Sequence, residues 1–333
     1  MNKAMFFTSV FVIIIMFCIT GCGRDDDITF QPDNGGLTWK EAANSTFGSS
    51  AIRNVSYINN KFFAVGDDGK IAYSTDGKIW TAVITAFTDT IYGIAYGDGM
   101  YVIAGTFIFK HSTDLMTWTD IPPNVFGIPG PGNRIIYDIV YSDNQFLACG
   151  SNASTFRSID GITWERWNNP LEWYDDLKVS IYDANTYIAA GGRSVMVFST
   201  NNTILQKIDL NPFTSQNEIS GIAYGDNRFV AAGVEGLIIY TDDITVQWTR
   251  VPGALKSFGY AQIYDITYGD GKFIVVGSKG YIGHSKDKGE SWITAKESTF
   301  DNTAIIRSVA YGNGVFVAVG ANGQIAYYST EKE

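Results

Sequence analysis

The chain contains very little histidine and cysteine, with two His and three Cys among 333 residues. Cys18 and Cys22 belong to the N-terminal segment and Cys149 lies in an apolar run, so neither a disulfide framework nor a Cys/His metal cluster is expected. Basic residues are also few: 24 Lys and Arg stand against 34 Asp and Glu, and the formal net charge is −10. Nucleic acid is not expected as a partner, because phosphate binding needs a broad basic face. No metal and no cofactor is expected.

A Tyr followed nine residues later by a Gly recurs seven times along the chain. The pairs are Tyr57/Gly66, Tyr96/Gly105, Tyr141/Gly150, Tyr182/Gly191, Tyr224/Gly233, Tyr268/Gly277 and Tyr311/Gly320, with successive tyrosines 39 to 45 residues apart. Short apolar runs separated by turn residues at this period are typical of propeller blades. The sequence therefore predicts an all-β fold, a seven-bladed β-propeller of four-stranded antiparallel blades.

The two ends of the chain complete one repeat between them. The last repeat stops at Ser329 and Thr330 after three strands, and the missing strand and its Trp39 stand at the other end. We expect this N-terminal strand to complete the C-terminal blade, which closes the ring and leaves no open sheet edge. The propeller is predicted to span residues 34–333 as one domain, and a monomer is expected.

The N-terminal segment is predicted to be a lipoprotein signal. Lys3 precedes an apolar run over residues 4–20, which is short for a membrane span and typical of a signal peptide. Residues 19–22 (Ile-Thr-Gly-Cys) resemble the lipobox of bacterial lipoproteins, which implies a signal peptide over residues 1–21 and a lipid on Cys22. The acidic tether over 22–33 resembles a surface-export signal of some Gram-negative groups; a solvated tether is the alternative. We expect a lipid-anchored protein of the bacterial cell envelope, at the outer membrane and surface-exposed.

A second motif, Ser-x-Asp-x-Gly-x-x-Trp, joins the third and fourth strands of most repeats. Its aspartates are Asp76, Asp114, Asp160, Asp243 and Asp287. These segments resemble the Asp-box, or bacterial-neuraminidase repeat, of sialidases and many non-enzymatic propellers. Each Asp is expected to accept backbone N–H bonds inside its turn while the Trp packs on its own sheet, which is a structural role.

Ligand binding is expected on the face that carries the loops between blades, since these loops are long and irregular. The position four residues before each repeat Tyr should form a ring at the mouth of the channel on this face. Its members are Arg53, Tyr92, Tyr137, Lys178, Ser220, Tyr264 and Arg307, and Asp138 and Asp265 directly follow two of the tyrosines. This mixture suits an anionic or hydroxyl-rich group of a ligand. The alternative is that these side chains cap strand ends and pair with nearby acids.

A second candidate site lies in the loop over residues 167–177. Trp173 and Tyr174 stand there between carboxylates. Neighbouring exposed aromatics suit stacking on sugar rings or an anchor for a peptide. The alternative is that Trp173 packs inward as part of the core.

The function that these features favour is binding without catalysis. Sialidases are six-bladed and use three arginines with a Tyr/Glu pair, whereas the predicted ring has two arginines, with Glu235 and Arg193 on nearby hairpins. Residues 64–80 more closely resemble the repeats of the photosystem II assembly-factor family of lipoprotein propellers, which implies a scaffold that holds another molecule. We expect a protein or glycan ligand on the loop-bearing face. A glycoside hydrolase and an assembly factor for a membrane complex are the alternatives.

Overall fold

The computed structural model describes residues 37–122, 135–172, 175–200, 202–208, 210, 218–252, 261–295 and 298–330. The signal segment, the tether, Cys22, Trp173 and Tyr174 lie outside these residues, so the expectations placed on them stay predictions. Within the described ranges the chain forms seven four-stranded sheets and no α-helix. No helix in these ranges is long and apolar enough to cross a membrane. The predicted seven-bladed propeller is confirmed.

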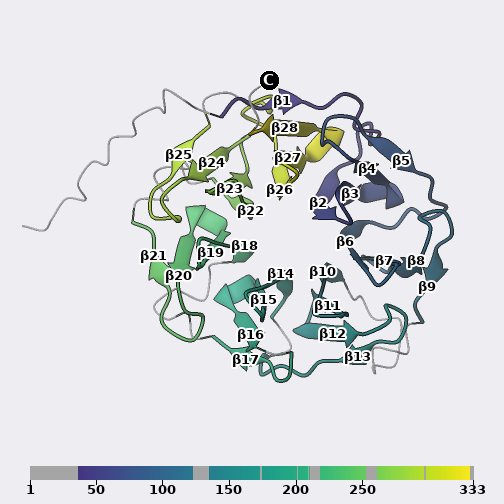
Figure 1. Ribbon diagram of the computed structural model, residues 1–333, viewed down its shortest axis with the longest axis horizontal. Helices are drawn as coiled ribbons and strands as arrows, with labels where there is room; N and C mark the ends of the chain where they lie inside the picture. The colour runs from purple at the N-terminus through teal and green to yellow at the C-terminus, as the bar shows by residue number, and fades with distance from the viewer. Residues whose placement is uncertain are drawn as a thin grey trace, which may run out of the picture. The chain divides into compact units, whose positions relative to one another are not determined.

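The seven sheets stand around a central channel, with the first strand of each blade innermost and the fourth at the rim (Figure 1). The first strands are β2 (Ile52–Ile58), β6 (Ile91–Gly97), β10 (Ile136–Ser142), β14 (Leu177–Asp183), β18 (Ile219–Gly225), β22 (Ile263–Gly269) and β26 (Ile306–Gly312). The second strands are β3 (Lys61–Gly66), β7 (Met100–Gly105), β11 (Gln145–Gly150), β15 (Thr186–Gly191), β19 (Arg228–Gly233), β23 (Lys272–Gly277) and β27 (Val315–Gly320). The third strands are β4 (Ile71–Ser74), β8 (Phe109–Ser112), β12 (Ser154–Ser158), β16 (Met196–Thr200), β20 (Ile238–Thr241), β24 (Ile282–Ser285) and β28 (Ile325–Ser329). The fourth strands are β5 (Thr81–Val83), β9 (Thr119–Asp120), β13 (Glu165–Arg166), β17 (Gln206–Lys207), β21 (Thr249–Arg250), β25 (Ile293–Thr294) and β1 (Lys40–Glu41).

Strand β1 closes the ring as the sequence predicts. It pairs antiparallel with β28, Lys40 opposite Tyr327 and Glu41 opposite Ala326, and Figure 1 shows the two strands side by side. Trp39, just before β1, is 3% exposed and packs against Tyr328 with 6.1 Å between ring centroids. The N-terminal strand therefore brings its own core residue into the last blade.

The second strands explain the long apolar runs of the sequence. In β3 the four residues from Phe62 to Val65 are all fully buried, because a strand in the middle of a blade is covered on both faces by neighbouring blades. A strand buried on both faces reads as a continuous apolar run rather than an alternation. The seven copies of this strand make the core of the ring.

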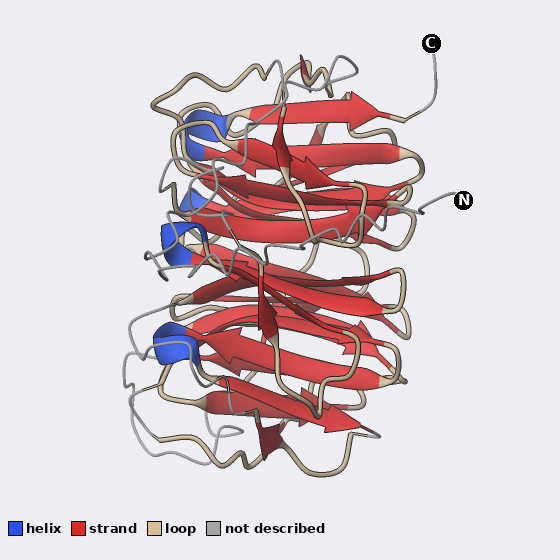
Figure 2. Ribbon diagram, turned by 90° about the vertical axis from the view of Figure 1, so that its left-hand side faces the viewer, coloured by secondary structure: helices blue, strands red, loops and turns tan. Residues whose placement is uncertain are grey.

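The propeller has two faces that differ in their connections. The loop face carries the connections between blades and, within the described ranges, four short 3-10 turns, which gather at one side of the molecule in Figure 2. These turns are η1 (Asp67–Gly69), η3 (Gly192–Ser194), η4 (Val234–Gly236) and η5 (Ala321–Gly323). The opposite, turn face carries the Ser-Asp-Trp turns between third and fourth strands.

Candidate functional site at the loop-face mouth

Every member of the predicted ring lies at a β-bulge in the first strand of its blade. In the first blade Ile52 opposes Gly66 and Asn54 opposes Val65, so the pairing skips Arg53. The same irregularity falls at Tyr92, Tyr137, Lys178, Ser220, Tyr264 and Arg307 in the other six blades. A bulge leaves one residue out of the ladder and re-aims its side chain. The seven bulge residues form what we call the mouth ring.

The repeat Gly is required beside this bulge, because the backbone there leaves no room for a side chain. A Cβ atom on Gly66 would lie 2.2 Å from the carbonyl oxygen of Ala51, and the corresponding clash recurs at 1.8 to 2.2 Å in all seven blades. The same carbonyl accepts a hydrogen bond of 3.0 Å from the N–H of Asp67, the residue after the Gly. The residue after each repeat Gly is therefore held close to the bulge residue of its own blade.

In the first blade this geometry produces an ion pair. The Nε and Nη2 of Arg53 donate to the two carboxylate oxygens of Asp67 at 2.7 and 2.8 Å. Partial burial opposes ionisation of Asp67, but the hydrogen bonds from Arg53 and Thr90 leave its pKa below the ordinary value. Arg53 thus has an internal counter-ion, as the capping alternative expected.

Two tyrosines continue the ring from Arg53. The guanidinium carbon of Arg53 lies 5.9 Å from the centroid of the Tyr92 ring, and the Tyr92 and Tyr137 rings are 5.7 Å apart. The phenol of Tyr137 donates to the carboxylate of Asp176 at 3.4 Å. Burial and then the charge of Asp176 raise the pKa of Tyr137 to about 12. The structure brings these three ring members into one contiguous surface.

On the far side of the mouth the polar groups are paired locally. The Nζ of Lys178 lies 2.8 Å from a carboxylate oxygen of Glu218, which stands just before β18. The hydroxyl of Tyr264 donates to the side-chain oxygen of Gln262 at 2.8 Å. Lys178, like Arg53, has a counter-ion within the chain.

Arg307 differs from the other two cations. Its Nε is buried and has no hydrogen-bond partner among the described residues, and no carboxylate of those residues forms an ion pair with it. Desolvation by burial, and then the positive charge of Arg53, lower the pKa of Arg307 from its ordinary value. The mouth therefore holds one desolvated guanidinium whose partner is missing from the described part of the chain.

Asp138 and Asp265 do not join the mouth ring but bind the neighbouring blade. Asp138 accepts hydrogen bonds from the N–H and hydroxyl of Ser180 at 2.7 and 3.2 Å, and Asp265 accepts from Ser308 and from the N–H of Val309 at 2.8 and 2.9 Å. Both line the channel cavity, whose volume is about 410 Å³. Enclosure within the ring raises the pKa of Asp138 to about 7 and that of Asp265 to about 6, against these hydrogen bonds. Their geometry indicates ties between blades.

The hairpin residues Arg193 and Glu235 occupy the middle of η3 and η4. Both have positive φ, 55° and 56°. The Nη1 of Arg193 lies 3.9 Å from Asp175, and the Arg193 side chain is 60% exposed. Arg193 is therefore turned toward Asp175, whereas Arg307 Nε has no partner among the described residues.

On the turn face the motif aspartates bond within their own turns. Asp76 accepts from the hydroxyl of Ser74 and from the N–H groups of Lys78 and Ile79 at 2.8 to 3.0 Å. Partial burial works against ionisation, yet the backbone bonds lower the pKa of Asp76. Asp114, Asp160, Asp243 and Asp287 make the same kind of bonds within their own turns. Side chains of this face are used to hold the turns.

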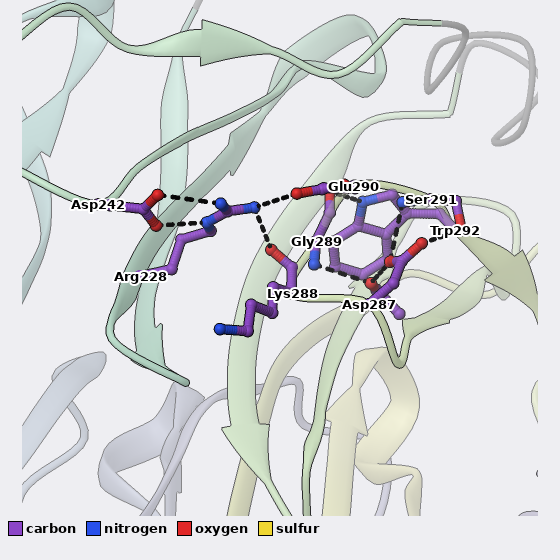
Figure 3. A network of polar contacts seen from close by, with 9 residues as sticks. Arg228, Asp242, Asp287, Lys288, Gly289, Glu290, Ser291 and Trp292 are labelled. Carbon is purple, nitrogen blue, oxygen red and sulfur yellow. Dashed lines mark hydrogen bonds and ion pairs between the residues drawn. The ribbon is translucent and has the colours of Figure 1, made fainter.

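The turn face also ties blades together, as the network around Arg228 shows. Arg228 donates Nε and Nη2 to the Asp242 carboxylate at 2.6 and 3.0 Å and Nη1 to Glu290 at 2.8 Å. Figure 3 shows the guanidinium between Asp242 and the turn that contains Asp287 and Trp292. Arg228 therefore fastens the fifth blade to the turn of the sixth, and its guanidinium is fully engaged.

Sequence reasoning found the mouth ring but not the bulge or the counter-ion beside it. The sequence does hold one regular spacing: the repeat Gly stands thirteen residues after each ring member, and the N–H of the next residue bonds the carbonyl two residues before that member. In the first blade this next residue is Asp67, which pairs with Arg53. The same comparison does not predict the pairing of Lys178, because the residue after its repeat Gly is Gly192 and its counter-ion is Glu218.

The fold and the mouth define a seven-bladed propeller with a polar ring on its loop face. A family model described as the DUF6242 β-propeller domain matches residues 15–129. No curated protein matches the sequence.

Among solved structures, the chain is similar to YCF48 bound to D1 peptide, with 15% identity and a TM-score of 0.69 over 91% of this chain and 100% of that chain. It is also similar to YCF48 from Cyanidioschyzon merolae, with 16% identity and a TM-score of 0.68 over 89% and 100%. The WD40 β-propeller domain of Doa1 gives 15% identity and a TM-score of 0.67 over 89% and 98%. At these identities the likeness is one of fold.

Proposed function

We propose that this propeller is a binding scaffold that holds a protein ligand on its loop face, without catalysis. The observation that carries the proposal is the mouth ring: a bulge at the same end of each first strand leaves one residue of every blade out of the ladder. Bulges that re-aim side chains are frequent next to functional sites. The contiguous Arg53, Tyr92 and Tyr137 provide the cation and aromatic surface that protein interfaces favour.

A solved structure of similar fold supports a peptide as the kind of ligand. YCF48 is described as bound to D1 peptide, and a propeller of this type therefore offers a surface on which a peptide can lie. An assembly factor for a membrane complex is a particular form of the same scaffold role. For a sialidase-like hydrolase the support is weaker, since Arg53 and Lys178 are already occupied by Asp67 and Glu218.

The test is capture of ligands on peptide and glycan arrays by the purified chain. A variant with Tyr92, Tyr137 and Tyr264 all changed to Ala should lose binding, because these residues supply the aromatic surface of the mouth. The control carries Ile79→Ser and Met116→Ser on the turn face, where both side chains are strongly exposed. Equal binding by both variants would contradict a loop-face site, and capture of glycans alone would replace the protein ligand with a glycan.

The proposed setting is the bacterial cell envelope, with a lipid on Cys22 as the anchor. The lipobox-like residues 19–22 support this proposal. Cys22→Ser should move the protein from the membrane fraction to the soluble fraction while thermal unfolding of the propeller stays the same. An unchanged membrane fraction would overturn the lipid anchor and leave the binding role to its own test.

A further inference from the structure

The two arginines of the mouth ring stand at equivalent positions but have different surroundings. Each is the bulge residue of a first strand, and each faces the residue that follows the repeat Gly of its own blade. For Arg53 that residue is Asp67. For Arg307 it is Ala321, whose N–H bonds the carbonyl of Ile305 at 2.9 Å as the N–H of Asp67 bonds that of Ala51. The backbone is the same, and the carboxylate is missing.

The missing carboxylate leaves Arg307 in an unfavourable state. A partly buried guanidinium costs free energy unless it is paired, and here its Nε is wholly buried with no partner among the described residues. The charge of Arg53 lies close enough to disfavour that of Arg307. Each blade repeats the same backbone, so the chain had an obvious place for a counter-ion and does not use it.

We propose that Arg307 is the anion subsite of the loop face and that it binds a carboxylate carried by the ligand, in the place that Ala321 leaves open. This inference rests on the proposed binding role of the mouth. The edge of a guanidinium formed by Nε and a terminal nitrogen matches a planar carboxylate with two parallel hydrogen bonds. Arg53 and Asp67 already show this arrangement one blade away, at 2.7 and 2.8 Å.

The surroundings of Arg307 favour a carboxylate on a larger ligand. Strand β26, which carries Arg307, packs between β22, which carries Tyr264, and β2, which carries Arg53. Arg307 therefore stands in the ring between an aromatic member and the Arg53–Asp67 pair. A ligand that rests on Tyr92 would place a carboxylate within reach of Arg307. Asp67 limits the excess positive charge at the mouth, which suits a single carboxylate better than a doubly charged phosphate.

The experiment is a titration of the ¹⁵N-labelled full chain with sodium acetate, at constant ionic strength set with sodium chloride. The Nε–H resonance of Arg307, assigned through its loss in Arg307→Gln, should shift and saturate, while that of Arg53 should stay in place. Ala321→Asp supplies the missing counter-ion and should weaken acetate binding by about tenfold or more. Ala321→Asn has nearly the same size without the charge and should keep the response. Asp67→Ala should make Arg53 a second acetate-sensitive resonance.

Several outcomes would overturn the proposal. It is wrong if the Arg307 resonance ignores acetate, if the response survives in Ala321→Asp, or if inorganic phosphate binds Arg307 more tightly than acetate. The titration uses no macromolecular ligand, so its failure leaves the loop-face test with the tyrosine variants intact. Conversely, an acetate response at Arg307 together with equal ligand binding by the tyrosine variant and its turn-face control would support the subsite and reject the proposed function.

Discussion

The two faces of the propeller differ in how completely their charged side chains are paired. On the turn face Asp76 accepts three hydrogen bonds within its own turn and Arg228 is held by two carboxylates. On the loop face Arg307 has a buried Nε without a partner among the described residues. One face uses its charged groups to hold the blades, and the other keeps a charged group unpaired at the mouth of the channel.

This difference indicates how a repeat fold can separate stability from binding. Unpaired, desolvated charges lower stability and are retained where they serve a ligand. Because the seven blades share one backbone, an unpaired charge in one blade can be compared with the equivalent position in the others. We therefore expect the turn face and the closing strand to raise the free energy of unfolding, and the unpaired charge at the mouth to lower it.

The largest effect is expected from removal of the strand that closes the ring. Deleting residues 34–42 removes β1 and the buried Trp39, and should cost about 4 kcal/mol or more of unfolding free energy, because loss of a buried Trp alone costs about 3–5 kcal/mol. The opened edge of β28 should also promote association. Urea denaturation and light scattering measure both effects. Glu41→Ala, an exposed position in the same strand, should be nearly neutral, and a truncated protein that melts like the full chain would contradict the closure.

The channel carboxylates should make stability depend on pH near neutrality. The folded-state pKa of Asp138 is raised to about 7, above an unfolded value of about 4, so the folded protein binds more protons between these values. Stability from this group is therefore present at low pH and is lost as the pH rises through about 7. Between pH 5 and pH 8 the wild-type protein should lose about 2–3 kcal/mol more than Asp138→Asn in urea denaturation. If the unfolding free energies of the two proteins change with pH in the same way, Asp138 is not the cause of the pH dependence.

A matched pair of aspartates compares the two faces directly. Asp76→Ala leaves two backbone N–H groups and the Ser74 hydroxyl without an acceptor and should cost about 1–2 kcal/mol. Asp68→Asn on the loop face keeps a residue suited to the positive φ of 59° at this position. It weakens one exposed hydrogen bond, from the hydroxyl of Ser50, and should cost less than about 0.5 kcal/mol. Chemical denaturation of both variants makes the comparison. Equal losses of unfolding free energy would mean that the turn face contributes no more to stability than the loop face.

Much of this architecture could be predicted from the sequence, because a strand pattern that is uncertain in one repeat is clear when seven repeats are compared. The Tyr/Gly period and the Trp39 segment predicted the blade number and the closing strand. What the sequence did not reveal is which polar groups pair with which. The position of Asp138 in the sequence suggested the mouth, but its bonds to Ser180 depend on how two blades approach each other across the channel wall. The pairing of Arg53 with Asp67 depends on a bulge, and a bulge changes register without any residue type that is unique to it.

The smallest and most specific effect should distinguish the two mouth arginines. Arg53→Gln breaks a partly exposed ion pair, leaves Asp67 unpaired and should lower the unfolding free energy by about 0.5–1 kcal/mol. Arg307→Gln removes an unpaired, partly desolvated charge and its repulsion with Arg53, and should leave the unfolding free energy unchanged or raise it by about 0.5 kcal/mol. Opposite signs in urea denaturation at low salt, converging as salt screens the charges, are the expected result. If Arg307→Gln costs as much as Arg53→Gln, then Arg307 has a counter-ion within the chain and its place at the mouth serves the fold.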